Sequence, residues 1–184
     1  MPSSGSRIFA GIDPSLRSTG LVIIGPGILD ISKITPKNID GVKRLQYIRN
    51  AISIKTKDCE AVCMEGPSLY SVNRADDIGQ LRGVLLVALA DMEIPTIVIP
   101  PTSLKKFATG RGDASKEQMI EAAKLKTGGE ISGDDEADAF WLALLAQGLH
   151  APTSDLTRYQ LDTIRGIRMP KVKSKVSYAR NLNI

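Results

Sequence analysis

Two acidic residues end short apolar stretches, at points where a buried strand would stop. Asp13 follows the apolar residues 8–12, and Glu65 follows residues 61–64. An unpaired charge at the margin of a core is costly, and two such acids side by side repel unless a proton or a cation lies between them. They therefore indicate either a chemical site or ordinary strand ends. In the second case Asp13 would form a turn before Pro14, and the Glu65 side chain would point into solvent before Gly66.

A second group of acids opens an apolar helix that we expect at about residues 134–147. Asp135 and Asp138 are three positions apart and Asp134 and Asp138 four apart, so either pair shares one helix face. Acids in a first helical turn also complement the helix dipole and cap free N–H groups, which explains Asp134, Asp135 and Glu136 without any chemistry. Asp138 fits that explanation less well, because it lies further into the helix between two alanines.

If the strand ends and the helix start meet, four carboxylates would form an all-oxygen site for two divalent cations. His150 is the only histidine, which excludes histidine-rich zinc sites, and oxygen ligands favour a hard cation such as Mg²⁺. Two cations about 3.5–4 Å apart can bind a phosphate, activate a water and stabilise the departing oxygen. Cys59 and Cys63 flank an expected strand and are interpreted as small core side chains.

The elements that must position these acids follow an α/β pattern. We expect strands at residues 7–13, 19–25, 28–34, 60–65 and 96–99, and helices at 40–55, 74–92, just after Pro101, 115–126 and 134–147. The first three strands form an antiparallel meander, and the later β–α–β crossovers imply parallel pairing. The fold class is therefore α/β, with a mixed five-stranded sheet flanked by helices.

Composition and charge narrow the class of protein. A chain of 184 residues with 42% apolar residues suits one domain, which we place at residues 1–150, followed by a basic extension at 151–184. From Arg158 onward there are seven basic residues against one acidic residue, which suits a polyanion partner or simply a solvated end. No apolar run approaches the roughly 18 residues of a membrane span, and no secretory signal opens the chain, so we expect a cytoplasmic protein without membrane contact.

Five segments in order resemble the RuvC group of Holliday-junction resolvases, within the ribonuclease H-like superfamily. They are GIDPSLRSTG (11–20), MEGPSLY (64–70), IGQLRGVLL (78–86), PTSLKKFATGRGDASKEQM (101–119) and DDEADAFWLALL (134–145). The similarity spans roughly residues 7–148, about three-quarters of the chain. No single motif is decisive, but their order, with an acid at each expected place, is specific. The resemblance implies a ribonuclease H-like fold.

The resemblance also assigns roles to individual residues. It implies catalytic metal-binding roles for Asp13, Glu65, Asp135 and Asp138, with two Mg²⁺ per site and Mn²⁺ as the alternative ion, and it favours Asp135 over Asp134. Lys105 and Lys116 align with lysines that contact the scissile strand, and the alternative is that they are surface lysines on amphipathic helices. The complete set of candidate DNA-binding residues is Lys105, Lys106, Lys116, Arg111, Leu69, Tyr70 and Arg74, and Lys116 is also a catalytic candidate.

The implied activity is that of a structure-specific DNA endonuclease in recombination and repair. It would cut a four-way junction symmetrically as a homodimer, because the junction itself is two-fold symmetric. Residues 78, 81, 85 and 89 form an apolar stripe that fits either a dimer face or the core of one subunit.

Three other functions stay open from the sequence. The first keeps the catalysis but acts on flaps, replication forks or RNA. The second is a non-catalytic nucleic-acid-binding module of the same fold. The third is an actin-like sugar kinase or ATPase, whose phosphate-binding turn residues 11–20 also resemble, but 184 residues are too few for the two lobes that such a protein needs.

Overall fold

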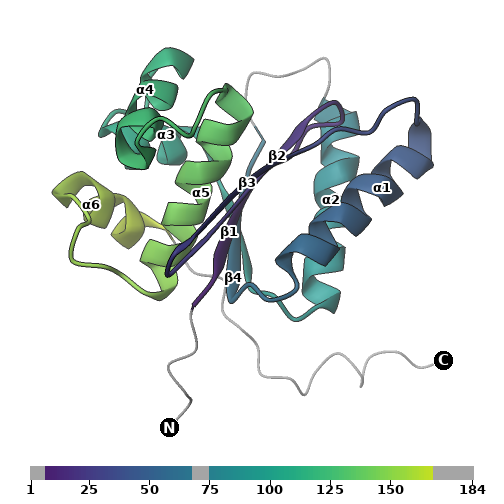
Figure 1. The fold of residues 1–184 in the computed structure, drawn as a ribbon, viewed down its shortest axis with the longest axis horizontal. Coiled ribbons are helices and arrows are strands. Elements are labelled where there is room, and N and C mark those ends of the chain that lie inside the picture. Colours follow the sequence, from purple (N-terminus) through teal and green to yellow (C-terminus); the bar gives the residue numbers. More distant parts are fainter. Residues whose placement is uncertain (1–6, 68–74, 168–184) are drawn as a thin grey trace, which may run out of the picture.

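The structure is a computed structural model that describes residues 7–67 and 75–167 (Figure 1). Its centre is a five-stranded sheet in the order β3-β2-β1-β4-β5. The strands are β1 (Phe9–Asp13), β2 (Thr19–Gly25), β3 (Ile28–Ile34), β4 (Ala61–Glu65) and β5 (Thr96–Ile99). β1, β2 and β3 pair antiparallel, whereas β1–β4 and β4–β5 pair parallel. The predicted mixed sheet, with its meander and its parallel half, is confirmed.

Helices cover both faces of the sheet, as Figure 1 shows. α1 (Gly41–Thr56) and α2 (Ala75–Asp91) lie on one face, and α5 (Asp134–His150) lies on the other, with α3 (Pro101–Thr109), α4 (Lys116–Thr127) and α6 (Arg158–Gly166) outside it. Each face has its own apolar cluster, because successive β1 side chains point to opposite faces. Phe9 packs toward α5, and Ala10 and Ile12 pack toward α1 and α2, all three being fully buried.

Two glycines let α5 lie directly on the sheet. A Cβ at Gly11 would lie 2.0 Å from the carbonyl oxygen of Ala139, and one at Gly20 would lie 2.3 Å from that of Asp135. Both distances are far inside van der Waals contact, so only glycine fits at either position. The first turn of α5 is thereby brought against β2, and its next turns are brought against β1.

The apolar stripe on α2 belongs to the core. Leu81, Leu85 and Leu89 are fully buried against the sheet, and Ile78 is partly buried. Of the two interpretations offered for this stripe, the intramolecular one holds, and the suggestion that these leucines form a dimer face is wrong. The apolar spacing identified the buried side of the helix but not the surface that covers it.

α6 lies within the segment that the sequence analysis treated only as a basic extension, and no helix was predicted there. It begins with a capping box between Thr157 and Gln160 and packs against α3, burying Gln160 and Thr163. Cys59 and Cys63 are buried free thiols, consistent with small core side chains. Within residues 7–67 and 75–167, no helix is long and apolar enough to cross a membrane.

Candidate active site

Asp13 and Glu65 end neighbouring parallel strands at one edge of the sheet. β1 and β4 are in register up to the pair Ile12–Met64, so the two acids follow side by side. Asp13 also pairs across β1 and β2 with Gly20, the residue against which the Asp135 backbone packs. The local topology therefore brings both strand ends and the start of α5 to the same place, as the sequence analysis expected.

The two strand-end acids share one electrostatic environment. Burial raises the pKa of Asp13 well above its usual value, and the charge of Glu65 and a side-chain hydrogen bond with it raise it further. Burial also raises the pKa of Glu65, against the opposing effect of its hydrogen bond with Asp13 and of the nearby Arg82. Both the burial of these carboxyl groups and the hydrogen bond between them oppose the doubly charged state of the pair.

Asp138 belongs to the same cluster. Burial, followed by the negative charges of Glu65 and Asp134, raises its pKa to about 7. Asp138 and Asp135 in turn raise the pKa of Asp13. These mutual effects place the acids of β1, β4 and α5 within electrostatic reach of one another.

Asp134 has a different role from Asp135. Its carboxylate accepts a 2.6 Å hydrogen bond from the Lys116 ammonium at the start of α4, and this bond lowers the pKa of Asp134. Asp135 instead lies with its backbone against Gly20, beside Asp13. Within the described ranges, none of Asp13, Glu65, Asp135 and Asp138 forms an ion pair within 4 Å.

Three cations border the acid cluster. Lys105 and Lys116 each oppose the rise in the pKa of Glu65 and of Asp138, which places both lysines near the acids. Arg82 of α2, which the sequence analysis did not select, donates hydrogen bonds of 2.9 and 3.0 Å to the carbonyl oxygens of Glu65 and Gly66. An arginine directly beside the buried leucine stripe of this helix was the signal that could have identified it.

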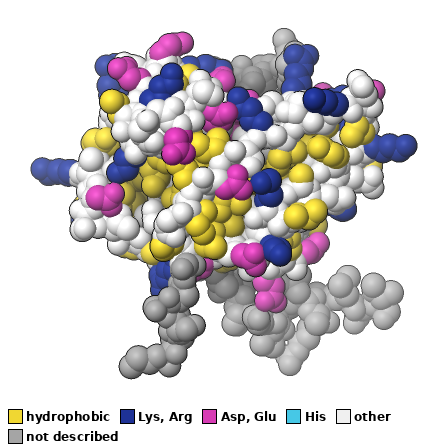
Figure 2. Space-filling view, viewed as in Figure 1, with side chains coloured by type: hydrophobic (Ala, Val, Ile, Leu, Met, Phe, Trp, Pro, Cys, Tyr) yellow, Lys and Arg dark blue, Asp and Glu magenta, His cyan; other side chains and the backbone are white. Residues whose placement is uncertain are grey.

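The remaining DNA-binding candidates differ in what the structure says of them. Arg111 pairs with Asp113 at 3.2 Å, and Lys106 is exposed on α3. On the face seen in Figure 2, basic and acidic side chains alternate over α3 and α4 without forming one continuous basic patch. Leu69, Tyr70 and Arg74, together with the tail from residue 168, lie outside the described residues.

The donor set suits a hard divalent cation, although it is not arranged as a finished cage. Its members are half-buried carboxylates, and burial raises the pKa of Asp13, Glu65 and Asp138, a penalty on the charged form that a bound cation would relieve. In the part of the chain that the structure describes, no group of three or more His, Cys, Asp or Glu side chains is set in metal-binding geometry. Since bare carboxylates repel, the side chains would have to turn inward around an ion.

Comparisons with known proteins decide the family. The model of the family "Crossover junction endodeoxyribonuclease RuvC" matches residues 9–146. The chain belongs to the RuvC family. A RuvC crossover junction endodeoxyribonuclease from Thermotoga maritima is 32% identical over 155 residues, covering 76% of this chain and 89% of that protein. One from Chloroflexus aggregans is 31% identical over 154 residues, covering 78% and 93%.

Solved structures agree with this family and fold. A structure of Thermus thermophilus RuvC in complex with Holliday junction substrate is similar with a TM-score of 0.66 and 25% identity, covering 75% of this chain and 91% of that one. A second T. thermophilus RuvC structure has a TM-score of 0.64 at 25% identity. The expected RuvC membership and ribonuclease H-like fold are thus both confirmed.

Proposed function

We propose that this RuvC-family chain is a structure-specific endonuclease that resolves four-way DNA junctions in recombination and repair. The observation that carries the proposal is the acid cluster where β1 and β4 end side by side and α5 begins, in which burial raises the pKa of Asp13, Glu65 and Asp138. Clustered acids with raised pKa values mark functional sites more often than structural ones. We place the protein with the DNA that it would process, in the cytoplasm.

The site would hold Mg²⁺ through Asp13, Glu65, Asp135 and Asp138, with two ions per site, and Mn²⁺ is expected to substitute. When bound, such ions supply an activated water and stabilise the leaving oxygen of a phosphodiester. The residues of the chain have separate tasks: Lys105 and Lys116 bind the phosphate next to the acids, and Arg82 holds the end of β4 by its two backbone contacts. Lys116 must exchange Asp134 for a phosphate oxygen to do so.

The wider DNA surface is proposed from the remaining candidates. Lys106 and Arg111 extend it along α3 and the following loop, where Arg111 would exchange Asp113 for DNA. Leu69, Tyr70 and Arg74 belong to the segment between β4 and α2, next to Glu65 in the chain. We propose that this segment lies against the crossover point of the junction.

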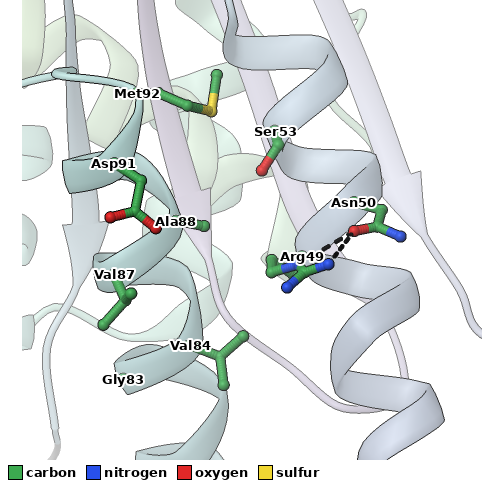
Figure 3. Close-up of a pocket in the computed structure, with 9 residues that line it drawn as sticks. All are labelled: Arg49, Asn50, Ser53, Gly83, Val84, Val87, Ala88, Asp91 and Met92. Atoms are coloured by element: carbon green, nitrogen blue, oxygen red, sulfur yellow. Dashed lines mark hydrogen bonds between the residues drawn. The ribbon is translucent and has the colours of Figure 1, made fainter.

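We also propose that the protein acts as a homodimer, because a two-fold symmetric junction requires two equivalent sites. The buried α2 leucines do not form the contact. A groove of about 550 Å³ between α1 and α2, lined in part by Val87, is a better candidate; Figure 3 shows Val84 and Ala88 of α2 on one side of it and Arg49 and Ser53 of α1 on the other. Val87 is 61% exposed, so a partner that covers this groove would bury apolar surface.

The test is incubation of the full chain with an immobile four-way junction, a flap, a replication fork, an RNA–DNA hybrid and a linear duplex, each with and without Mg²⁺. We expect paired nicks in opposing arms of the junction only, dependent on Mg²⁺, from a species whose sedimentation gives twice the chain mass. Asp13→Asn should keep junction binding and lose cleavage. Cleavage of flaps, forks or RNA at a higher rate would favour the alternative substrates, and binding without cleavage by the unaltered chain would favour a non-catalytic module.

A further inference from the structure

A single ion pair ties the first turn of α5 to the outer strand of the meander. Lys33 of β3 lies 3.2 Å from Glu136, the third residue of α5. We propose that Lys33 and Glu136 are positioning residues that hold Asp135 and Asp138 in place relative to Asp13, and so set the affinity of the site for divalent cations. This inference rests on the proposed function, since it concerns the same metal site.

Lys33 stands in line with the acid site across the sheet. It pairs with Gly20 between β3 and β2, and Gly20 pairs with Asp13 between β2 and β1. Residues in one such row point to the same face, and the face at Gly20 is the one that α5 covers. Lys33 and Asp13 therefore lie at opposite ends of this row, with Gly20 between them, and both side chains point to the face that α5 covers.

Glu136 is held from several directions. Its side chain is only 13% exposed and accepts hydrogen bonds from the Ser132 backbone N–H and hydroxyl, both at 2.8 Å, and from the Gly133 N–H at 3.1 Å. The three contacts from residues 132 and 133 cap α5, and the ion pair with Lys33 joins this cap to β3. Without Lys33, the cap would stay intact but would lose its link to β3.

The consequence for the site follows from adjacency. Asp135 precedes Glu136 directly, and the Asp135 backbone is pressed against Gly20 on β2. The start of α5 is thus held by close contact with β2 and by the ion pair with β3. Together these two contacts set its distance from the sheet and its rotation about its own axis, and so the position of its acids relative to Asp13. Lys33 is 41% exposed, so the pair adds little to global stability, and its main effect is on geometry.

Three variants of the full chain separate this role from others. Lys33→Met removes the ion pair and keeps the cap. Glu136→Gln also removes the ion pair, while its amide oxygen can still accept from the N–H groups of Ser132 and Gly133. The matched control is Lys55→Met, which removes the 3.1 Å ion pair between α1 and Asp30 of the same strand β3, on the face away from α5.

Mn²⁺ binding is measured directly by calorimetry or electron paramagnetic resonance, alongside the Mg²⁺ concentration for half-maximal junction cleavage. Groups that orient metal ligands typically change affinity by about tenfold or more, so we expect Lys33→Met and Glu136→Gln to weaken Mn²⁺ binding by about fivefold or more. The double variant should be no worse than either single one, because both remove the same contact. Lys33→Arg keeps a cation opposite Glu136 and should bind Mn²⁺ as the unaltered chain does. Lys55→Met should also match the unaltered chain.

Junction binding in EDTA distinguishes positioning from direct DNA contact. We expect all variants to bind the junction equally without metal. If Lys33→Met weakens that binding while Glu136→Gln does not, Lys33 contacts phosphate and the inference is overturned. It is also overturned if Lys33→Met binds Mn²⁺ as tightly as Lys55→Met in a protein that cleaves junctions. An unaltered chain that neither binds Mn²⁺ nor cleaves junctions would instead overturn the proposed function, and the inference with it.

Discussion

Asp138 shows why these carboxylates are costly to the folded chain on their own. Its pKa is raised to about 7 by burial and then by the charges of Glu65 and Asp134. Burial and the neighbouring negative charges make the ionised form of Asp138 costly at neutral pH. A bound cation would offset that cost, because it stabilises the carboxylate. Two protein states, protonated and metal-bound, are therefore favoured over the bare anionic one.

A stability measurement can detect this property. Because the folded-state pKa of Asp138 lies above its unfolded value of 3.8, the folded protein binds more protons between these values, and stability falls as pH rises from about 4 to 7. In EDTA, Asp138→Asn should be more stable than the unaltered chain at pH 8, by about 2 kcal/mol after allowance for solvent contact. At pH 5 the difference should be much smaller, as followed by thermal unfolding.

Asp113→Asn is the control for that experiment. Asp113 is an exposed acid whose pKa is lowered by its hydrogen bond with Arg111, so it is ionised at both pH values. Its removal should leave the change in stability between pH 5 and pH 8 unaltered. Added Mg²⁺ should stabilise the unaltered chain at pH 8 and should have a smaller effect on Asp138→Asn. Equal pH dependence in the unaltered chain and Asp138→Asn would contradict the buried state of this acid.

At the scale of elements, the site depends on how closely α5 approaches the sheet. Gly20→Ala places a methyl group about 2.3 Å from the Asp135 carbonyl oxygen, so the start of α5 must move. We expect destabilisation of about 1–3 kcal/mol and a loss of junction cleavage of about a hundredfold, because a displacement near 1 Å misaligns catalytic groups. Unfolding and single-turnover cleavage measure the two effects.

Gly79→Ala is the matched control for the glycine experiment. A Cβ at Gly79 of α2 meets nothing within 4 Å, and alanine is the better helix former by about 1 kcal/mol. This variant should be at least as stable as the unaltered chain and should cleave normally. If Gly20→Ala cleaves as well as Gly79→Ala, the close approach of α5 does not position the site.

The sequence predicted the positions of the strands and helices better than the contacts that these elements make with one another. Strands such as β1 were identifiable because they are apolar on both faces, and the acids stood out because each ended such a stretch. Arg82 and Lys33 were not found, since their roles depend on contacts across the fold and not on local spacing. The α2 stripe was ambiguous for the same reason.

α6 was missed for a different reason. Its basic residues drew attention to charge, and it has no long apolar run, so it was treated as part of the extension. The capping box formed by Thr157 and Gln160 was the local signal that marked a helix start. Its packing onto α3 is a tertiary contact that the sequence pattern does not contain.

For the molecule as a whole, the two faces of the sheet have different tasks. α5 and the elements outside it carry the proposed site residues Asp135, Asp138, Lys105 and Lys116, whereas α1 and α2 form the groove proposed for a second copy (Figures 1 and 3). The acids lie at the edge of the central strands between these faces. A dimer formed through α1 and α2 would therefore leave α3, α4 and the start of α5 open to DNA.

The basic tail beyond α6 is expected to affect DNA binding separately from the acid site. Truncation after Pro152 would remove α6 and expose the α3 surface that it covers, so the cut belongs after Ile167. Residues 168–184 contain five basic residues and no acidic one. Each phosphate contact contributes about 0.9 to the slope of log affinity against log salt, so truncation should make that slope shallower by up to about 4.5 and weaken junction binding at low salt.

A full-length variant in which Lys171, Lys173 and Lys175 are changed to Gln separates the effect of charge from that of chain length. Its change in the salt slope should be up to about three-fifths of the change that truncation causes. Thermal unfolding should be unchanged in both proteins, since α6 is retained. The positions of the nicks should also be unchanged, because the acids proposed for the cleavage site lie on β1, β4 and α5. A salt slope equal to that of the unaltered chain would mean that the tail does not contact DNA, and its charge would then be that of a solvated end.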